Sequence, residues 1–304
     1  MDKTELSVII VSYNTREILQ NCIESIIKFK NKLNIEIILV DNNSKDGTVD
    51  EFKKSNSIYQ KYKSIIKIIK NQSNYGFAKA NNQGMRIAKG KYILLLNSDT
   101  LIETNVFQEM IDFIEEKNVG IVSSMLRNID GSNQGTGGYF PSLFRVFCWM
   151  FFVEDIPFLD RFLKFFHPPH SSHQNNKFIE LDWVTGAFFL FKRKLVGEIG
   201  YFDEDYFMYV EEVDFCYRAK QNNYRVLVNP NSYIIHLGGA SGGSGFSIVW
   251  EFKNIKLFFK KHYNKWQYPI LNLFLRTGSL LRAGLYVILK PELAKTYAKT
   301  FIGI

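Results

Sequence analysis

The chain has 304 residues, of which 46% are hydrophobic and 22% are charged, as is usual for a folded globular protein with a substantial core. Its length allows one large domain or two fused halves. The net charge of +8 favours anionic partners. No cluster of arginine and lysine with interleaved aromatic residues occurs early in the chain, so we do not expect nucleic acid among those partners.

The cysteines give no sign of a disulfide framework or of a zinc site. Cys22, Cys148 and Cys216 lie far apart, are odd in number and form no CxxC pair. The first apolar run, Leu6–Val11, is too short for a secretory leader and follows acidic residues. We therefore expect a reduced, cytoplasmic protein.

The first 125 residues alternate between buried strands and helices. We expect strands over Leu6–Tyr13, Ile35–Asp41, Ile65–Lys70, Tyr92–Leu96 and Gly120–Met125, and helices over Thr15–Phe29, Gly76–Ala88 and Thr104–Glu116. Continuous apolar runs of this kind are typical of parallel strands that are covered on both faces. The sequence therefore predicts an α/β fold, with a mostly parallel, Rossmann-like sheet flanked by helices.

Polar residues follow four successive predicted strands. They are Ser12-Tyr13-Asn14, Asp41-Asn42-Asn43, Asn71 and Asn97-Ser98-Asp99. Ligands of open α/β sheets bind outside the carboxyl ends of the strands. The pattern therefore predicts a binding crevice at this edge.

Residues 126–246 follow a different pattern. Residues 139–176 mix aromatic residues, prolines and histidines without clear periodicity. Beyond them we expect strands over Phe178–Val184, Ala187–Lys192, Arg225–Val228 and Tyr233–His236, a helix over Val210–Gln221 and a Gly/Ser-rich loop over 238–245. Residues 247–304 form a helical tail, with helices expected over Ser247–His262 and Tyr268–Leu289.

Two carboxylates at strand ends are candidates for nucleotide chemistry. Asp99 could hold a divalent cation that shares diphosphate oxygens and neutralises a leaving diphosphate, or it could cap the next helix. Asp41 could accept a hydrogen bond from a pyrimidine N–H or a ribose hydroxyl, or it could form an Asx turn. Tyr13 could stack on a base or belong to the core.

The acidic cluster of Glu211, Glu212 and Asp214 is a candidate for acid–base chemistry. A transfer that inverts the anomeric carbon needs a base to take the acceptor's proton, and neighbouring carboxylates and apolar surroundings would raise its pKa toward neutrality. The alternative is a helix N-terminus that favours acidic residues. His236 is either structural or a metal ligand, and the loop that follows it could close over a donor.

Taken in order, seven segments resemble glycosyltransferase family 2 and its GT-A fold, in the rhamnosyltransferase-like branch. The segments are Ser7–Asn14, Ile38–Thr48, Asn74–Gly84, Leu96–Thr100, Trp183–Ala187, Gly200–Glu204 and Phe207–Cys216. The resemblance covers the chain from about residue 6 to about residue 260. It implies that residues 1–125 bind the nucleotide sugar and that residues 126–246 carry the acceptor-binding and catalytic half of the same domain.

The resemblance also implies roles for individual residues. Asp99 would ligate Mg²⁺ or Mn²⁺, with His236 as a further ligand, and Glu212 would be the base, with Glu211 as the other candidate. The remaining implied contacts with the nucleotide sugar are Ser12, Tyr13, Asn14, Asp41, Asn43, Asn74, Gly76, Lys79, Asn82, Asn97 and Ser98. Trp183, Thr185 and Gly186 would lie on the side of the acceptor and donor sugar. The chain departs from the family pattern in having only one carboxylate in Asn97-Ser98-Asp99, and Glu212 where aspartate is common.

These features together predict a metal-dependent, inverting glycosyltransferase of surface polysaccharide biosynthesis. The resemblance makes dTDP-L-rhamnose the first expected donor and a UDP-hexose the second, with a glycan or lipid-linked glycan as acceptor. Residues 12–17 lack the GxGxxG turn of a dinucleotide-dependent oxidoreductase, and no P-loop or basic Gly-rich loop of a nucleotidyltransferase is present. A non-catalytic module that binds nucleotide sugars or glycans remains the alternative.

The tail raises the question of membrane contact. Arg276 and Arg282 interrupt the apolar run Tyr268–Leu289, which disfavours a membrane-spanning helix. The preceding segment, Lys253–Lys265, is rich in lysine and aromatic residues. We therefore expect peripheral contact with an anionic membrane at the inner face of the cell membrane, with packing on the core or an oligomer contact as alternatives.

Overall fold

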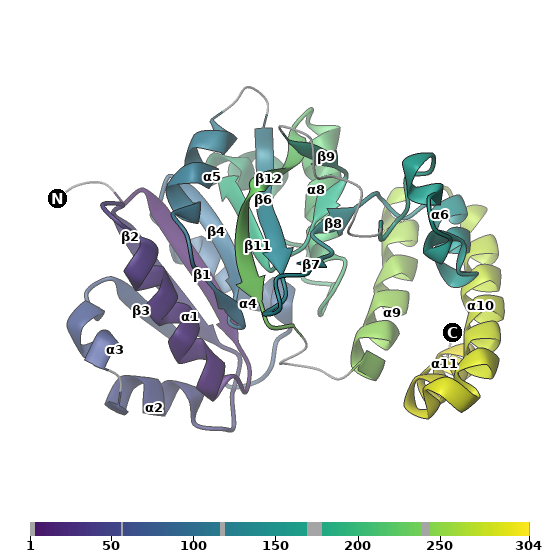
Figure 1. The fold of residues 1–304 in the computed structure, drawn as a ribbon, viewed down its shortest axis with the longest axis horizontal. Helices are drawn as coiled ribbons and strands as arrows, with labels where there is room; N and C mark the ends of the chain where they lie inside the picture. Colours follow the sequence, from purple (N-terminus) through teal and green to yellow (C-terminus); the bar gives the residue numbers. More distant parts are fainter. Residues whose placement is uncertain (1–3, 56, 116–118, 169–177, 239–243, 304) are drawn as a thin grey trace.

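The computed structural model describes residues 4–55, 57–115, 119–168, 178–238 and 244–303 (Figure 1). Its centre is a ten-stranded sheet in which the main path runs β3-β2-β1-β4-β11-β6-β12-β5. Most of the predicted Gly/Ser-rich loop over 238–245 lies outside the described residues, so its closure over a donor stays a prediction.

The first four strands confirm the predicted parallel arrangement. They are β1 (Leu6–Ser12), β2 (Ile35–Asp41), β3 (Ile66–Lys70) and β4 (Tyr92–Asn97), and the pairings among these four strands are parallel. In the register of the sheet, Ser12 stands opposite Asp41 and Val11 stands opposite Asn97. The polar ends of these strands therefore lie along one edge, as the sequence predicts.

The second part of the sheet is mixed. Strand β11 (Phe188–Lys192) runs antiparallel between β4 and β6 (Val119–Arg127), and β6 pairs in parallel with β12 (Arg225–His236). The two strands expected at Arg225–Val228 and Tyr233–His236 are one strand, interrupted by a register shift between Asn229 and Tyr233. Because the shift adds unpaired residues, the apolar pattern breaks although the strand continues.

Three short strands complete the sheet beside β6 and β12. They are β5 (Thr100–Leu101), which pairs with the end of β12, β7 (Asn133–Gln134), which pairs with the end of β6, and β9 (Ile179–Leu181), which pairs with the beginning of β12. A separate two-stranded ribbon joins β8 (Gly137–Gly138) to β10 (Trp183–Val184). The single strand expected over Phe178–Val184 is thus divided between β9 and β10.

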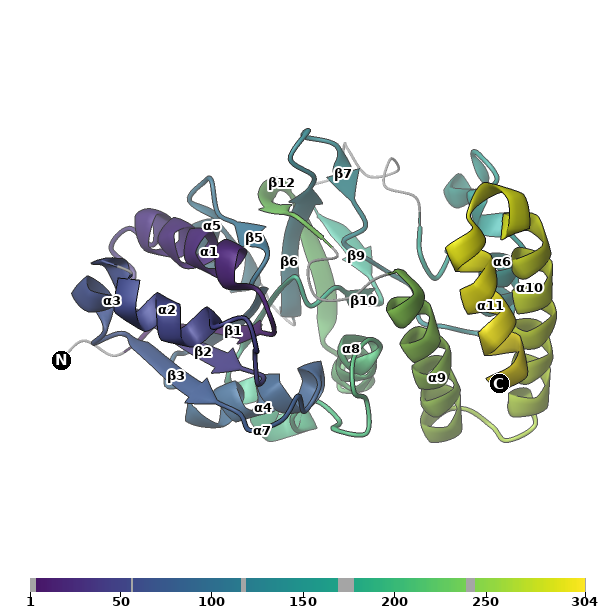
Figure 2. The same cartoon turned by 90° about the horizontal axis from the view of Figure 1, so that it is seen from below.

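Helices cover both faces of the sheet, as predicted. The helices of this part are α1 (Arg16–Phe29), α2 (Thr48–Ser55), α3 (Ser57–Tyr62), α4 (Phe77–Ile87), α5 (Val106–Ile114), α7 (Lys194–Ile199) and α8 (Glu211–Gln221). Figure 2 shows α1 and α5 on one side of the sheet, and α4 and α7 on the other. Alternate residues of β1 divide between the two cores, because Val8 and Ile10 pack in one and Ile9 packs in the other.

A layer of helices stands beside the sheet (Figure 1). It consists of α9 (Ser244–His262), α10 (Gln267–Leu289), α11 (Pro291–Gly303) and α6 (Leu143–Met150). Arg282 of α10 is buried, and its guanidinium donates to the carbonyl oxygens of Trp149 and Met150. Within the described ranges, none of the helices has both the length and the hydropathy that crossing a membrane requires.

Candidate active site

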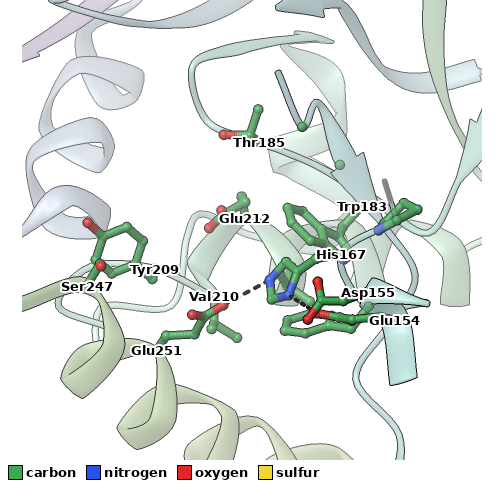
Figure 3. Close-up of a pocket in the computed structure, with 15 residues that line it drawn as sticks. Glu154, Asp155, His167, Trp183, Thr185, Tyr209, Val210, Glu212, Ser247 and Glu251 are labelled. Atoms are coloured by element: carbon green, nitrogen blue, oxygen red, sulfur yellow. Dashed lines mark ion pairs between the residues drawn. The ribbon is translucent and has the colours of Figure 1, made fainter. Parts of the chain in front are cut away.

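A pocket of about 560 Å³ opens between α8, α9 and the segment that ends in β10 (Figure 3). Three of the residues predicted from the sequence, Glu212, Trp183 and Thr185, line it together. The other lining residues include Glu154, Asp155, His167, Tyr209, Ser247 and Glu251. The pocket therefore combines aromatic surfaces with several carboxylates.

The backbone that presents Glu212 is conformationally strained. Tyr209 and Val210 both have positive φ angles, 69° and 72°, immediately before α8. A β-branched residue rarely adopts this conformation, which costs of order 1–3 kcal/mol and persists only where neighbours impose it. The buried amide of Asn254 donates to the carbonyl oxygens of Met208 and Tyr209, both at 2.8 Å, and so holds the turn in place.

Gly76 supports the same turn from the other side. The backbone N–H of Phe77 donates to the carbonyl oxygen of Phe207 at 2.7 Å. Gly76 has φ of 83°, and a Cβ atom there would lie 2.2 Å from that same oxygen. The glycine is thus required by close backbone approach as well as by its conformation.

We expect Gly76→Ala to lower the free energy of unfolding by more than Gly131→Ala does. Gly131 has the same φ of 83° but has no atom within 4 Å of a built Cβ, so its substitution measures the conformational cost alone, roughly 1–3 kcal/mol. Urea unfolding of the two variants gives the comparison. Equal losses would show that the contact with Phe207 is readily relieved.

The two adjacent glutamates differ in environment. Burial and the neighbouring Glu212 raise the pKa of Glu211 well above its ordinary value, and Glu211 is absent from the pocket lining. Burial and the nearby Glu251 also raise the pKa of Glu212, to about 7, and Glu212 faces the pocket (Figure 3). This agrees with the predicted rise toward neutrality.

Asp214 lies apart from this pocket. Its buried carboxylate accepts hydrogen bonds from Arg218 Nε at 2.8 Å and from His262 at 2.6 Å. Although burial opposes ionisation, the bonds to His262 and the charge of Arg218 lower the pKa of Asp214. The structure therefore gives Asp214 a structural partnership between α8 and α9.

His167 supplies the positive charge of the pocket. Its Nε2 lies 3.0 Å from Glu251 and its Nδ1 lies 3.8 Å from Glu154 (Figure 3). Burial by itself would lower the pKa of His167, but Glu251 and Glu154 outweigh it and raise the pKa to about 10. The imidazole therefore stays protonated at neutral pH.

Asp99 and His236 lie side by side at the end of the sheet. His236 Nε2 lies 3.3 Å from an Asp99 oxygen, and His236 Nδ1 lies 2.8 Å from Gln134 Oε1. Gln134 donates its amide N–H groups to the carbonyl oxygen of His236 and to Asn128, so its oxygen faces the ring. Nδ1 therefore donates to Gln134 Oε1, and Nε2 is the ring nitrogen that lies toward Asp99.

This donor set fits an open metal site. A carboxylate and a neutral imidazole nitrogen are both ligands of divalent cations, and an open site leaves positions for diphosphate oxygens or water. In the described part of the chain, no cluster of three or more His, Cys, Asp or Glu side chains is placed to hold a metal ion. Asn97 lies beside the pair, with its amide nitrogen 3.4 Å from His236 Nε2.

One short segment connects this pair to the pocket. Gln134 contacts His236, while Gly135 and Gly137 line the pocket. The N–H of Thr185, itself in the pocket lining, donates to the carbonyl oxygen of Thr136 at 2.9 Å. Residues 134–137 thus run from the Asp99–His236 pair to the pocket that Glu212 lines.

The predicted nucleotide end is assembled at the ends of β1 and β2. The buried Asp41 accepts a bond from the backbone of Ser44, and Asn14 Oδ1 accepts one from the N–H of Lys45 at 2.7 Å. Asn42 donates to Asn74 Oδ1 at 2.8 Å, which ties β2 to the start of α4. The sheet edge therefore gathers Ser12, Asn14, Asp41 and Asn74.

The other predicted contacts are distributed around this edge. Asn43 accepts a bond from Lys45, Lys79 lies over the ring of Tyr75 and Ser98 is buried, while Tyr13 is half-buried. Gly186 packs against the ring of Phe77. Asn82 is fully buried and binds the backbone of Phe202 and the carboxylate of Glu204, so it joins α4 to that segment.

The model of the family "Glycosyl transferase family 2" matches residues 7–200, which is more than half of the chain. The chain belongs to glycosyl transferase family 2. This confirms the resemblance seen in the sequence, and the protein is a glycosyltransferase.

Two curated relatives of this family 2 transferase align over most of their length. Glycosyltransferase GlyG of Streptococcus pneumoniae serotype 4 is 26% identical over 262 residues, which are 84% of this chain and 79% of the relative. The N-acetylglucosaminyl-diphospho-decaprenol L-rhamnosyltransferase of Mycobacterium tuberculosis is 23% identical over 300 residues, or 93% of this chain and 92% of the relative.

A solved structure supports the fold assignment. The mannosyltransferase PcManGT of Pyrobaculum calidifontis, in complex with GDP-Man and Mn²⁺, superposes with a TM-score of 0.60 at 16% identity, covering all of this chain and 75% of that one. The transferase therefore has the predicted GT-A fold.

Sequence reasoning missed several residues of the site. His167, Glu154 and Gln134 come from the stretch between residues 126 and 178, where the pattern has no clear period. Asn254 and Glu251 lie on α9, beyond the expected catalytic half. The glycines around Thr136 are the one local feature of the sequence that indicates this part of the site, because glycine is typical of positions where another backbone approaches closely.

Proposed function

We propose that this transferase inverts the anomeric carbon of its donor sugar, with Glu212 as the general base. The observation that carries the proposal is the position of Glu212 in a pocket with Trp183 and Thr185 and with a pKa near 7. A base of this pKa is present in substantial part as the carboxylate at neutral pH and is basic enough to accept a proton as the acceptor hydroxyl attacks. Glu211, buried outside the pocket lining, is not proposed as the base.

We propose Asp99 and His236 as the protein ligands of Mg²⁺ or Mn²⁺. The bound ion would neutralise the charge that develops on the leaving diphosphate. Gln134 accepts a hydrogen bond from His236 Nδ1 and so orients the ring with Nε2 available as the ligating nitrogen. Asp41, Ser12 and Asn14 lie where the sheet edge would receive the nucleoside.

The pocket favours a neutral acceptor. Glu154, Asp155, Glu212 and Glu251 line it, and His167 is the one basic side chain among its described lining residues. Carboxylates accept hydrogen bonds from sugar hydroxyls but repel phosphate groups. The aromatic faces of Trp183 and Tyr209 offer apolar surface to a sugar ring. The acceptor group is therefore a glycan hydroxyl.

The named relatives guide the choice of donor, acceptor and cellular location that we propose. We propose dTDP-L-rhamnose as the first donor to test and a UDP-hexose as the second, in the synthesis of a surface polysaccharide. The M. tuberculosis relative is named as a rhamnosyltransferase that acts on a lipid-linked sugar. A lipid-linked glycan acceptor would make peripheral contact of the C-terminal helices with the inner face of the cell membrane useful. An oligomer through the same helices is the alternative use of this surface.

A donor panel tests the proposal. The purified protein is incubated with Mn²⁺ or Mg²⁺ and with dTDP-, UDP- and GDP-sugars, and release of nucleoside diphosphate is measured with calorimetry of donor binding alongside. Metal-dependent release from one donor supports the proposal and names the sugar. If no donor binds in the presence of metal, the proposed nucleotide-sugar chemistry is wrong. Binding without turnover, with every acceptor tried, would favour the non-catalytic alternative.

The pH dependence of the rate should report Glu212. Because the base acts when deprotonated, the rate is expected to rise with pH through about 7. The positive charge of His167 lowers the pKa of Glu212 and the negative charge of Glu251 raises it. His167→Gln should therefore move the acidic limb to higher pH, and Glu251→Gln should move it to lower pH. Shifts in the same direction would contradict the assignment.

A further inference from the structure

Helix α9 separates the catalytic pocket from a second cavity. Ser247 and Glu251 of this helix line the pocket. Val249, Lys253 and Leu257 follow at helical spacing on another face and line a groove of about 590 Å³ between α9, the start of α10 and the end of α11. Asn254, which supports the turn before α8, also belongs to the groove lining, but no lysine of the groove has a role in the chemistry proposed above.

The groove combines an apolar wall with a group of lysines, here called the groove lysines. The apolar wall is formed by Val249, Phe252, Leu257 and Tyr268, and the groove lysines are Lys253, Lys256, Lys260 and Lys299. Asp205 also lines the groove, but its carboxylate is paired with Lys261 at 2.6 Å. Among the described residues, Lys253, Lys260 and Lys299 form no salt bridge, and Lys253 and Lys260 lie over the rings of Trp250 and Tyr268. No carboxylate therefore neutralises these three ammonium groups directly.

Exposed apolar side chains continue from the groove onto the helical layer. Ile302 at the end of α11 is 81% exposed, Val249 at the groove is 43% exposed, and Leu273 and Ile288 of α10 are 57% and 87% exposed. A surface that pairs apolar side chains with lysines is complementary to an anionic amphiphile. The catalytic pocket is acidic and offers no comparable site for a phosphate.

We propose that this groove binds an acidic phospholipid of a bilayer, with the phosphate at the groove lysines and the upper acyl chain against Val249 and Leu257. The proposal specifies the membrane contact proposed above and does not depend on the transfer chemistry. Glu251, which lines the acceptor pocket, and the groove lie on opposite faces of α9. A lipid bound in the groove would therefore keep the membrane surface within the width of one helix of the acceptor pocket.

The test uses the full chain and two matched quadruple variants. One replaces the groove lysines by glutamine, and the control replaces Lys53, Lys54, Lys61 and Lys63 of the region of α2 and α3, so that both lose the same charge. Binding is measured by co-sedimentation with phosphatidylcholine vesicles and with vesicles of phosphatidylcholine and phosphatidylglycerol in equal amounts. Circular dichroism checks the folding of each variant.

We expect the wild type and the control to bind the anionic vesicles, and the groove variant to bind about 100-fold more weakly. Val249→Asn, which leaves the charge unchanged, should also weaken binding, and inorganic phosphate should not compete. The proposal is overturned if the wild type ignores anionic vesicles, if both quadruple variants lose binding equally, or if inorganic phosphate displaces the vesicles. It is also overturned if sedimentation shows a dimer that the groove variant dissociates. Vesicle binding needs no donor, so its failure leaves the proposed sugar transfer untouched.

Discussion

Replacing Glu212 by glutamine is expected to reduce the rate of sugar transfer by about 10²–10⁴-fold, the contribution that a positioned general base makes. Glutamine has nearly the same shape but cannot accept the proton of the acceptor hydroxyl. Donor binding should persist, because Glu212 lies in the pocket at α8 while Asp41 and Asp99 lie at the sheet edge. Initial rates with a saturating acceptor and calorimetry with the donor measure the two effects separately.

Glu211→Gln is the matched control for this prediction. Glu211 is adjacent in sequence and has a buried carboxylate, but it does not line the pocket. Burial and the neighbouring Glu212 raise the pKa of Glu211 and so favour its uncharged form, which glutamine resembles, and the substitution should cost little rate. If Glu211→Gln loses most of the transfer rate while Glu212→Gln keeps it, Glu211 is the general base and Glu212 is not.

The first half of the fold was predictable because its signals are local. Strands β1, β2 and β4 are buried on both faces and so read as continuous apolar runs, and all three end at the same edge of the sheet. The placement of Ser12, Asp41 and Asn97–Asp99 along one edge then follows from the topology alone. Helix α2 was missed in this half because it is short and carries few apolar residues.

The second half depends on contacts between distant segments. His167 gains its function from Glu154 and Glu251, which lie 13 and 84 residues away along the chain. The role of Gln134 depends on His236, which is 102 residues distant. No local period encodes such pairs, so the sequence predicted Glu212 and His236 but not the residues that position or charge them.

Arg282 interrupts the apolar run of the tail and also fastens α10 to the end of α6. Arg282 was expected to disfavour a membrane-spanning helix, and in the structure α10 packs beside α6 and α11 instead. The guanidinium is buried because the carbonyl oxygens at the end of α6 and the hydroxyl of Tyr297 accept its N–H groups. The aromatic residues of 139–166 partly serve this packing, since Phe147 contacts Phe274 of α10.

Replacing Asp99 by alanine is expected to abolish high-affinity Mn²⁺ binding in the presence of nucleoside diphosphate. Among the described residues Asp99 is the one carboxylate paired with His236, so the variant would leave a single imidazole of the proposed ligand pair. Gln134→Leu should have a smaller effect, about 10–100-fold in metal affinity, because it removes only the hydrogen bond that orients His236.

Metal binding can be followed directly by calorimetry or by the electron paramagnetic resonance signal of free Mn²⁺, without any assay of activity. Asp50→Ala is the control, because the Asp50 side chain of α2 is 62% exposed and pairs with Lys70 of β3, the strand at the opposite end of the sheet from β12. An affinity for Mn²⁺ that falls from the wild type to Gln134→Leu and falls further to Asp99→Ala would support a site in which Asp99 and His236 bind the metal and Gln134 orients His236. Unchanged Mn²⁺ affinity in Asp99→Ala would place the metal ligands elsewhere and would leave the Asp99–His236 pair as a structural contact that joins β5 and β12.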